Sequence, residues 1–232
     1  MRQIPTSLLL LWDIDGTLLL RATGAHAAAL RRAAGTVHGV ELDGLGVEAA
    51  GRTDAAIARD LLRAAGVDDA SIDARAGEVA TAAVAAFEES CPANLAAYVA
   101  PGVDAALAAL ATEPDTYRLA LLTGNLEPVA RRKLASAGIG HYFAAGQGGF
   151  GSDAEDRAEL PAVARGRAGG WPRERTVVIG DTPRDIACAR ADGVRVIAVA
   201  TGPFSAEALA DADAVVDGAR AVLPVLADFA RG

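Results

Sequence analysis

Short apolar runs recur along the chain, and longer segments with a helical spacing of apolar residues separate them. The runs do not alternate between apolar and polar positions, so they predict parallel strands that are buried on both faces. Strands are expected at residues 8–12, 118–122, 176–179, 194–199 and 214–216. Helices are expected between and after them, at residues 102–111, 128–137, 183–191, 206–210 and 219–230. This alternation predicts an α/β fold with a doubly wound parallel sheet.

Residues 21–98 break the alternation, because they contain no convincing strand. They predict a helical insert, with helices at residues 25–34, 54–65 and 71–89. In the second of these, Ile57, Leu61 and Leu62 form an apolar stripe with the period of a helix. The predicted organisation is therefore a core of residues 1–20 and 99–232, into which residues 21–98 are inserted as a helical cap subdomain.

Two acids follow the first and most apolar strand, in the sequence "LLLLWDIDGT". Residues i and i+2 point to the same side of an extended chain, so Asp13 and Asp15 are expected to face one crevice. Open α/β sheets bind ligands at this carboxyl edge. Two close carboxylates repel each other, and a cation offsets that repulsion. Mg²⁺ suits such a site, because it prefers oxygen ligands and a few carboxylates.

Two later strands also end in polar motifs. "LLTGN" offers the hydroxyl of Thr123, and the following turn at Gly124 and Asn125 offers backbone N–H groups near a helix start, which favour an anion. "GDTPRD" supplies Asp181 and Asp185 beside Gly180. Each motif alone is compatible with a simple turn or a helix cap. The three together, each at the end of an apolar strand, favour one shared site.

Composition narrows the class of protein. The chain has 232 residues and a formal net charge of -8, which argues against a nucleic-acid partner and an anionic membrane surface. No apolar run approaches the roughly 20 residues of a membrane span, and the first run is too short and too soon interrupted for a signal peptide. Cys91 and Cys188 are isolated, which favours a reduced, cytoplasmic protein. The histidines at positions 26, 38 and 141 are scattered, so a histidine metal site is not expected.

These motifs resemble those of the haloacid dehalogenase (HAD) superfamily along the whole chain. "DIDGT" resembles its first motif, "LLTGN" its second and "GDTPRD" its fourth, and the insert resembles its C1-type cap. The resemblance implies a Rossmann-like core in which Asp13 is the nucleophile and Asp15 the general acid and base. It implies that Asp13, Asp181 and the backbone carbonyl of Asp15 hold Mg²⁺, with Asp185 supporting them. Thr123 is then expected to bind the phosphoryl group, next to Gly124 and Asn125.

The third family motif, a cation that bridges nucleophile and phosphate, is not evident. The matching region, "GGFGSDAEDRAELPAV", contains no lysine. Lys133 is the one lysine of the chain, and a compact point charge suits a phosphate oxygen, so Lys133 is predicted to be this cation. Arg157 is the rival for the role. A merely exposed, solubilising Lys133 is the other alternative.

An acid at position 15 points to a phosphatase or a phosphomutase within this family. The leading hypothesis is a Mg²⁺-dependent phosphatase that hydrolyses a small phosphorylated metabolite through an aspartyl-phosphate. The alternatives are a phosphomutase of the β-phosphoglucomutase type, a nucleotide or FMN phosphatase, and a binding module with little turnover. As an acid, Asp15 needs a pKa above the usual 3.9; partial burial and Asp13 are expected to raise it, and Mg²⁺ is expected to lower it.

The cap is expected to select the substrate. Its "GRTD" stretch resembles cap loops of phosphoglycolate phosphatase-like members. Arg52 is predicted to read a second anionic group of the substrate, whereas Thr53 or Asp54 suits an N-cap. The protein is expected to be a monomer or a homodimer without a nucleic-acid or membrane partner.

Overall fold

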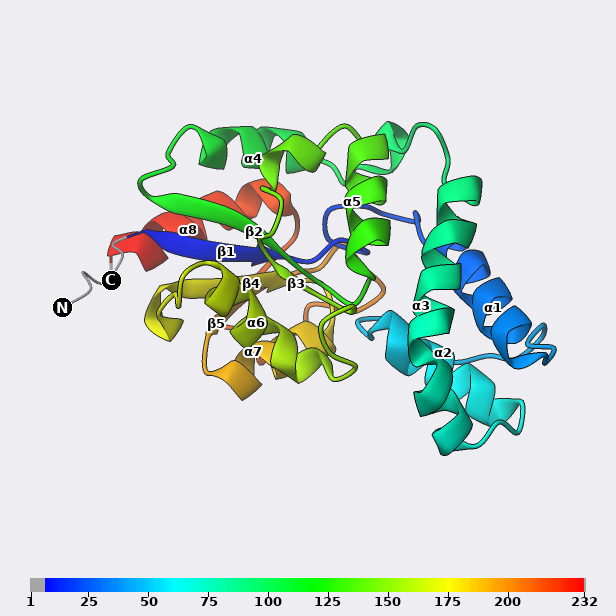
Figure 1. Cartoon of the computed structure of the whole chain (residues 1–232). Coiled ribbons are helices and arrows are strands. Elements are labelled where there is room, and N and C mark those ends of the chain that lie inside the picture. Colours follow the sequence, from blue (N-terminus) through cyan, green and yellow to red (C-terminus); the bar gives the residue numbers. More distant parts are fainter. Residues whose placement is uncertain (1–6, 232) are drawn as a thin grey trace.

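In a computed structural model, which describes residues 7–231, six parallel strands form one sheet in the order β3-β2-β1-β4-β5-β6 (Figure 1). The strands are β1 (Leu8–Trp12), β2 (Tyr117–Thr123), β3 (Gly149–Phe150), β4 (Thr176–Gly180), β5 (Arg195–Val199) and β6 (Ala214–Val216). The central strand β1 is fully buried and pairs with β2 and β4, so that Leu10 lies beside Leu119 and Val177. The predicted doubly wound α/β fold is confirmed.

Helices cover both faces of the sheet. They are α4 (Val103–Ala111), α5 (Glu127–Ser136), α6 (Leu160–Arg167), α7 (Pro183–Asp192) and α8 (Val222–Arg231), joined by short 3₁₀ turns at Ala96–Tyr98, Gly140–Tyr142, Arg157–Glu159, Arg173–Arg175 and Ala219–Ala221. The apolar residues of α4, α5 and α8 share one cluster with Leu10 and Trp12 of β1. Those of α6 and α7 share another with Leu9 and Leu11, because successive side chains of a strand point to opposite faces.

Three elements differ from the sequence expectation. The predicted helix at residues 206–210 is wrong. This segment, which connects β5 to β6, forms successive turns, and its Leu209 is buried. β3 was not expected, because two residues are too few to make an apolar run. α6 was not expected either, since its sequence "LPAVARGR" contains Pro161 and Gly166. Proline is tolerated in the first turn of a helix, where Pro161 lies.

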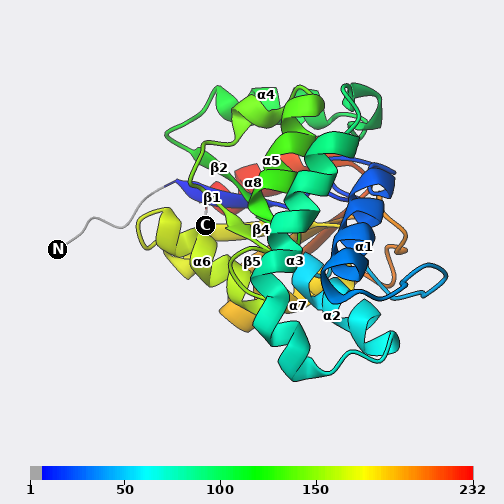
Figure 2. The same ribbon diagram turned by 45° about the vertical axis from the view of Figure 1, so that its right-hand side comes forward.

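The insert is helical, as predicted, with α1 (Gly24–His38), α2 (Asp54–Ala64) and α3 (Asp69–Ser90). These helices stand beyond the carboxyl ends of the strands, and α1 and α3 run side by side (Figures 1 and 2). They share their own apolar cluster, which includes Leu62 and Phe87. Leu126 and Val129 belong to the same cluster, so the start of α5 anchors the cap to the core.

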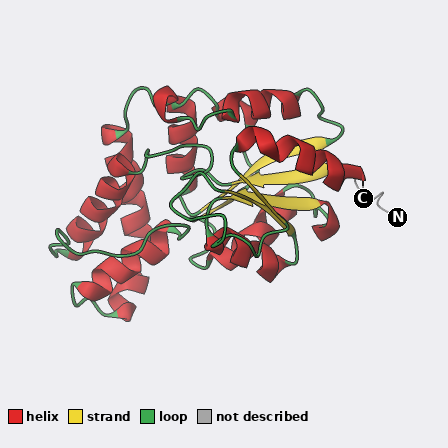
Figure 3. Ribbon diagram, turned by 180° about the vertical axis from the view of Figure 1, so that it is seen from behind, coloured by secondary structure: helices red, strands yellow, loops and turns green. Residues whose placement is uncertain are grey.

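The chain enters and leaves the insert along two adjacent segments, which pair at Leu19 and Val99. Figure 3 shows loops between the helices of the cap and the core that holds the sheet. The amide of Leu20 donates to the carbonyl of Tyr98 at 2.7 Å, and the amide of Ala100 donates to that of Leu18 at 3.0 Å. These bonds support the predicted boundaries of the cap at residues 21 and 98, which remain a prediction. Among the described residues, no helix combines the length and apolar character needed to cross a membrane.

Candidate functional site

The polar motifs meet at the carboxyl edge of the sheet, beneath the cap. Asp13 follows β1, Thr123 ends β2 and Asp181 follows β4, and all three side chains are buried. They line a cavity of about 590 Å³ together with Asp15 and Asn125. The sequence expectation that these strand ends form one site therefore agrees with the geometry.

The Asp181 carboxylate is closely surrounded by Thr17 and by two glycines. Thr17 donates its hydroxyl to Asp181 Oδ1 at 3.0 Å. Gly16 adopts a φ of +96°, and a Cβ there would lie 2.2 Å from Asp181 Oδ2. A Cβ at Gly202 would lie 1.8 Å from the same oxygen. Only glycine fits at these two positions, because the backbone approaches the carboxylate so closely.

Three carboxylates crowd together at this edge of the sheet, and two of them, Asp13 and Asp181, line the cavity. Asp13, Asp181 and Asp185 each offer an oxygen, and these oxygens all lie within 4.8 Å of one another. Burial, against the opposing charge of Arg157 and together with the charges of Asp185 and Asp15, raises the pKa of Asp13 to about 7. Burial and the charge of Asp13 raise the pKa of Asp181 to about 8. Such a cluster fits a hard divalent cation, which would offset the repulsion.

Asp185 lies closer to this cluster than the sequence indicated. It was expected only to support the metal, and its carboxylate now completes the three-acid group. One of its oxygens accepts from the amide and the hydroxyl of Thr182, at 2.9 and 2.8 Å, in the capping box that starts α7. Gly180 permits this approach, because a Cβ there would lie 2.2 Å from the Asp185 carboxyl carbon. The helix start thus holds the carboxylate in place.

The side chain of Asp15 points away from the three acids and toward Lys133. The Lys133 ammonium lies 2.7 Å from Asp15 Oδ2 and 2.9 Å from Oδ1. Asn125 donates to Asp15 Oδ2 at 2.9 Å and accepts from Lys133 at 2.9 Å. Lys133 is fully buried on α5, so it is not the exposed residue that one interpretation of the sequence allowed.

The ionisation of Asp15 differs from expectation. Burial alone would raise its pKa, but the charge of Lys133 and the hydrogen bonds from Lys133 and Asn125 outweigh burial and lower the pKa below 3.8. The expectation of a raised pKa assumed that Asp13 and burial dominate. The buried ammonium reverses the balance, so this conformation holds Asp15 as a carboxylate.

Two cap residues complete the surroundings of Lys133. His26 Nδ1, on α1, lies 3.1 Å from the ammonium, and His26 Nε2 lies 2.9 Å from Asp54 Oδ2. Asp54 is the first residue of α2, and its carboxylate also accepts from the amide of Leu126 at 2.8 Å. Thr53 is the N-cap of this helix, as one interpretation of "GRTD" expected.

Arg157 occupies the place beside the expected nucleophile. Its guanidinium lies 3.1 Å from Asp13 Oδ1 and 2.5 Å from Asp185 Oδ1. The prediction that Lys133 is the cation next to Asp13 therefore disagrees with the geometry, because the Lys133 side chain extends to Asp15 instead. Arg157 is buried, and its Nε has no partner among the described residues.

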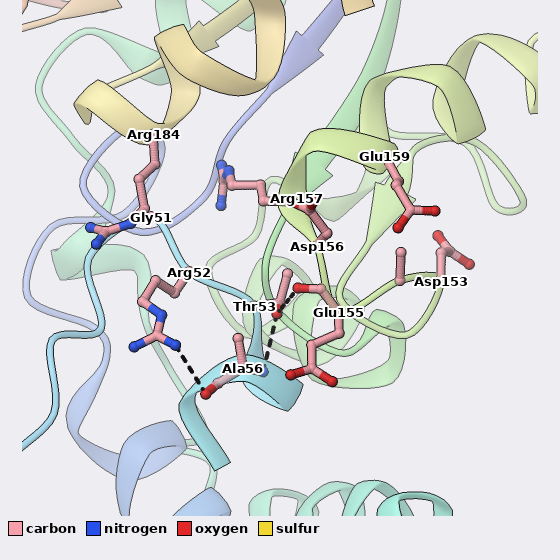
Figure 4. Close-up of a pocket in the computed structure, with 11 residues that line it drawn as sticks. Gly51, Arg52, Thr53, Ala56, Asp153, Glu155, Asp156, Arg157, Glu159 and Arg184 are labelled. Atoms are coloured by element: carbon pink, nitrogen blue, oxygen red, sulfur yellow. Dashed lines mark hydrogen bonds between the residues drawn. The ribbon is translucent and has the colours of Figure 1, made fainter. Parts of the chain in front are cut away.

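The Arg52 side chain forms hydrogen bonds with other residues of the cap. Its guanidinium donates to Asp60 at 2.6 Å. It also donates to the carbonyl of Ala56 at 3.1 Å (Figure 4). It borders both the cavity described above and a neighbouring one of about 680 Å³, between α2 and residues 153–159. In that second cavity Arg157 extends toward Gly51, away from the carboxylates of its own segment (Figure 4). The predicted reading of a second substrate anion by Arg52 gains no support, because Asp60 already neutralises it.

Sequence reasoning missed several residues of this site. Thr17 was present in the "DIDGT" motif but received no role. Thr201 and Gly202 repeat, after β5, the Thr-Gly pair that ends β2, and that repetition was a usable signal. His26 and Asp54 lie 28 positions apart, so only the three-dimensional packing of α1 on α2 reveals the pair.

Comparison with known proteins agrees with the motifs. The family model for haloacid dehalogenase-like hydrolases matches residues 10–190, and a HAD-hydrolase-like model matches residues 154–229. A search of curated proteins finds no match.

Solved structures show the same fold. A predicted phosphatase from Clostridium acetobutylicum is 17% identical with a TM-score of 0.68, over 96% of this chain and 99% of its own. A β-phosphoglucomutase from Clostridium difficile is 15% identical with a TM-score of 0.69, over 99% and 98%. A predicted phosphoglycolate phosphatase from Haemophilus somnus is 18% identical with a TM-score of 0.63, over 96% and 99%. With the family model covering most of its length, this chain belongs to the haloacid dehalogenase-like hydrolases.

Proposed function

We propose that the protein is a Mg²⁺-dependent phosphatase that hydrolyses a small phosphorylated metabolite through an aspartyl-phosphate on Asp13. One observation carries the proposal: Asp13 and Asp181 of a buried three-acid cluster line the same cavity beneath the helical cap as Asp15, which pairs separately with Lys133. The cluster suits a metal and a nucleophile. The pair suits proton transfer close by.

Asp13 and Asp181 would hold Mg²⁺, with Asp185 beside them and the backbone carbonyl of Asp15 as the fourth protein oxygen. When bound, the ion neutralises charge on the cluster and on the phosphoryl oxygens. Asp13 then attacks phosphorus, and the bond to the leaving oxygen breaks. Thr123 and the backbone at Gly124 lie at the end of β2, where they would hold the transferred group.

Asp15 moves the protons of both half-reactions. As a carboxylate it takes a proton from the water that hydrolyses the aspartyl-phosphate, and as an acid it returns a proton to the next leaving oxygen. The free protein holds Asp15 ionised, so the first proton has to enter with the substrate. A phosphate monoester with a second pKa of roughly 6 brings one as its monoanion.

We assign the cation beside the nucleophile to Arg157 and give Lys133 a different role. Arg157 contacts Asp13 and Asp185, where it would face the phosphoryl group, and a guanidinium can pair with two acceptors at once. Lys133 contacts Asp15, where it would set the position and charge of the acid and base. This reverses the assignment made from the sequence.

A phosphomutase remains the second candidate, because a β-phosphoglucomutase is among the similar folds. Such an enzyme holds a sugar bisphosphate, which needs cationic groups on the cap. Arg52 is bonded to Asp60, and Arg31 donates to the carbonyls of Leu42 and Leu45. These contacts favour hydrolysis. A binding module with little turnover would not need the ordered Asp15–Lys133 pair.

The first prediction concerns the nucleophile. Asp13→Asn should reduce phosphate release from an aryl phosphate to background, because the amide cannot attack phosphorus, and a chelator should do the same to the native protein. Asp104→Asn, exposed on α4, is the matched control and should hydrolyse normally. Phosphate release and a circular dichroism spectrum are measured for each. Turnover of Asp13→Asn near the native value would contradict the mechanism.

The second prediction concerns metal and pH. The raised pKa values of Asp13 and Asp181, about 7 and about 8, mean that the metal-free folded state binds more protons than the unfolded state above about pH 4. Stability in chelator should therefore fall as pH rises through that window. The lowered pKa of Asp15 acts only below its ordinary value and does not interfere. Mg²⁺ should raise the melting temperature more at about pH 8 than at about pH 5.

Thermal unfolding at matched ionic strength, with Na⁺ in place of Mg²⁺ as the control, measures this difference. Equal stabilisation by Mg²⁺ at both pH values would argue against binding at the three-acid cluster.

The third prediction separates the two cations. Arg157→Ala should lower kcat/KM by roughly 10²–10³-fold, the scale of lost transition-state stabilisation, whatever the leaving group. Lys133→Met should reduce turnover mainly for substrates with poor leaving groups, because it affects proton transfer. Steady-state kinetics with an aryl and an alkyl phosphate measure both. A mild Arg157→Ala together with a crippling, leaving-group-independent Lys133→Met would restore the original assignment.

A further inference from the structure

The Lys133 ammonium is saturated by groups from both parts of the molecule. An ammonium has three N–H donors and no acceptor. Asp15 and Asn125 of the core accept from it, and so does His26 Nδ1 of the cap. Because Lys133 is fully buried, losing any acceptor would leave a buried donor unpaired. The cap therefore supplies one of three partners that this buried charge needs.

The same contact determines the proton position on His26. Nδ1 faces a group that only donates, so Nδ1 accepts and Nε2 carries the hydrogen. Nε2 then donates to Asp54 Oδ2 at 2.9 Å. Asp54 is tied to the core in turn, since it accepts from the amide of Leu126 and its own amide donates to the carbonyl of Gly124 at 2.8 Å. The result is a continuous chain from Asp54 through His26 and Lys133 to Asp15.

We propose that His26 and Asp54 are positioning residues, which fix Lys133 against Asp15 when the cap rests on the core. This rests on the proposed function. His26 and Asp54 come from α1 and α2, whereas Lys133 and Asp15 come from α5 and the loop after β1. Lys133, which holds the proposed acid and base Asp15, therefore has all its partners only with the cap in this position. Neither cap residue needs to touch the reacting atoms.

The test compares two leaving groups, because a purely structural role would affect both equally. His26→Phe keeps the ring volume and removes both hydrogen bonds. It should lower kcat on an alkyl phosphate by about tenfold or more, a part of the 10²–10⁴ that acid–base work supplies. On para-nitrophenyl phosphate, which leaves readily without a proton, the loss should stay under about threefold.

His26→Gln, which offers both an acceptor and a donor, should restore part of the alkyl phosphate activity. His38→Gln at the end of the same helix is the matched control and should match the native protein for both substrates. Equal losses on both substrates for His26→Phe would overturn the proposal. Absence of hydrolysis by the native protein with Mg²⁺ would instead overturn the proposed function, so the two failures are distinguishable.

A second inference comes from a different observation, the cap side of the 590 Å³ cavity. Apolar side chains line it, from Ala27 and Leu30 of α1, Val47 and Ala49 of the loop, and Ile57 and Leu61 of α2. Of the cap arginines in the lining, Arg31 and Arg52 already donate to groups of the cap, whereas Arg21 is exposed, as is Thr23 near it in the chain. A substrate hydroxyl placed against the apolar side chains would lose water without gaining a partner, which is costly.

We infer that the part of the substrate that lies against these apolar side chains of the cap is itself apolar, and this too rests on the proposed function. With Mg²⁺, hexyl phosphate should be hydrolysed with a kcat/KM at least about tenfold above that for glucose 6-phosphate or phosphoglycolate, on the scale of burying a few methylenes. Ile57→Asn should reduce this preference. Val84→Asn, half-buried on α3 and outside the cavity, is the control and should preserve it.

A preference for the polar substrates, or an unchanged preference in Ile57→Asn, would overturn this inference. If none of the phosphates is hydrolysed, the proposed function itself fails.

Discussion

Repulsion between buried carboxylates is the constraint on which the site depends. Parallel strands deliver Asp13 and Asp181 to one edge and the first turn of α7 adds Asp185, with oxygens within 4.8 Å of one another. Burial makes each negative charge costly, and the raised pKa values of Asp13 and Asp181 express that cost. Glycine at positions 16, 180 and 202 permits this crowding, because a Cβ at any of these positions would collide with a carboxylate. The fold maintains an arrangement that only added positive charge makes favourable.

Two cationic side chains form ion pairs with different acids of the site. Arg157 serves Asp13 and Asp185, and Lys133 serves Asp15. The division has a chemical consequence, because it places opposite electrostatic conditions a short distance apart. The pKa of Asp13 is raised and that of Asp15 is lowered, although both follow the same strand. Separate environments of this kind allow two neighbouring carboxyl groups to take different roles.

The sequence was sufficient where a short, local pattern determines structure. Buried parallel strands make continuous apolar runs, and β1, β4 and β6 matched their predicted ranges to within one residue. Local patterns failed at β3, which is held by its neighbour β2, and at residues 206–210, where the apolar content suits a turn as well as a helix. In the site, the strand-end acids were predictable because topology brings such ends together. The pairing of Lys133 with Asp15 was not predictable, because the direction of a long side chain depends on which acceptors surround it. The contact between His26 and Asp54 was not predictable either, because the two residues are far apart in the sequence.

Burial of Lys133 couples the cap to Asp15, the acid and base of the proposed mechanism. A surface lysine would tolerate the loss of one acceptor, because water would replace it. A fully buried ammonium has no such substitute, so its energy depends on His26 remaining in place. His26 in turn depends on Asp54, which is bonded to the backbone of the loop after β2. Any displacement of the cap that moves His26 must therefore weaken the hold on Asp15, so Lys133 has its complete set of partners only with the cap in this position.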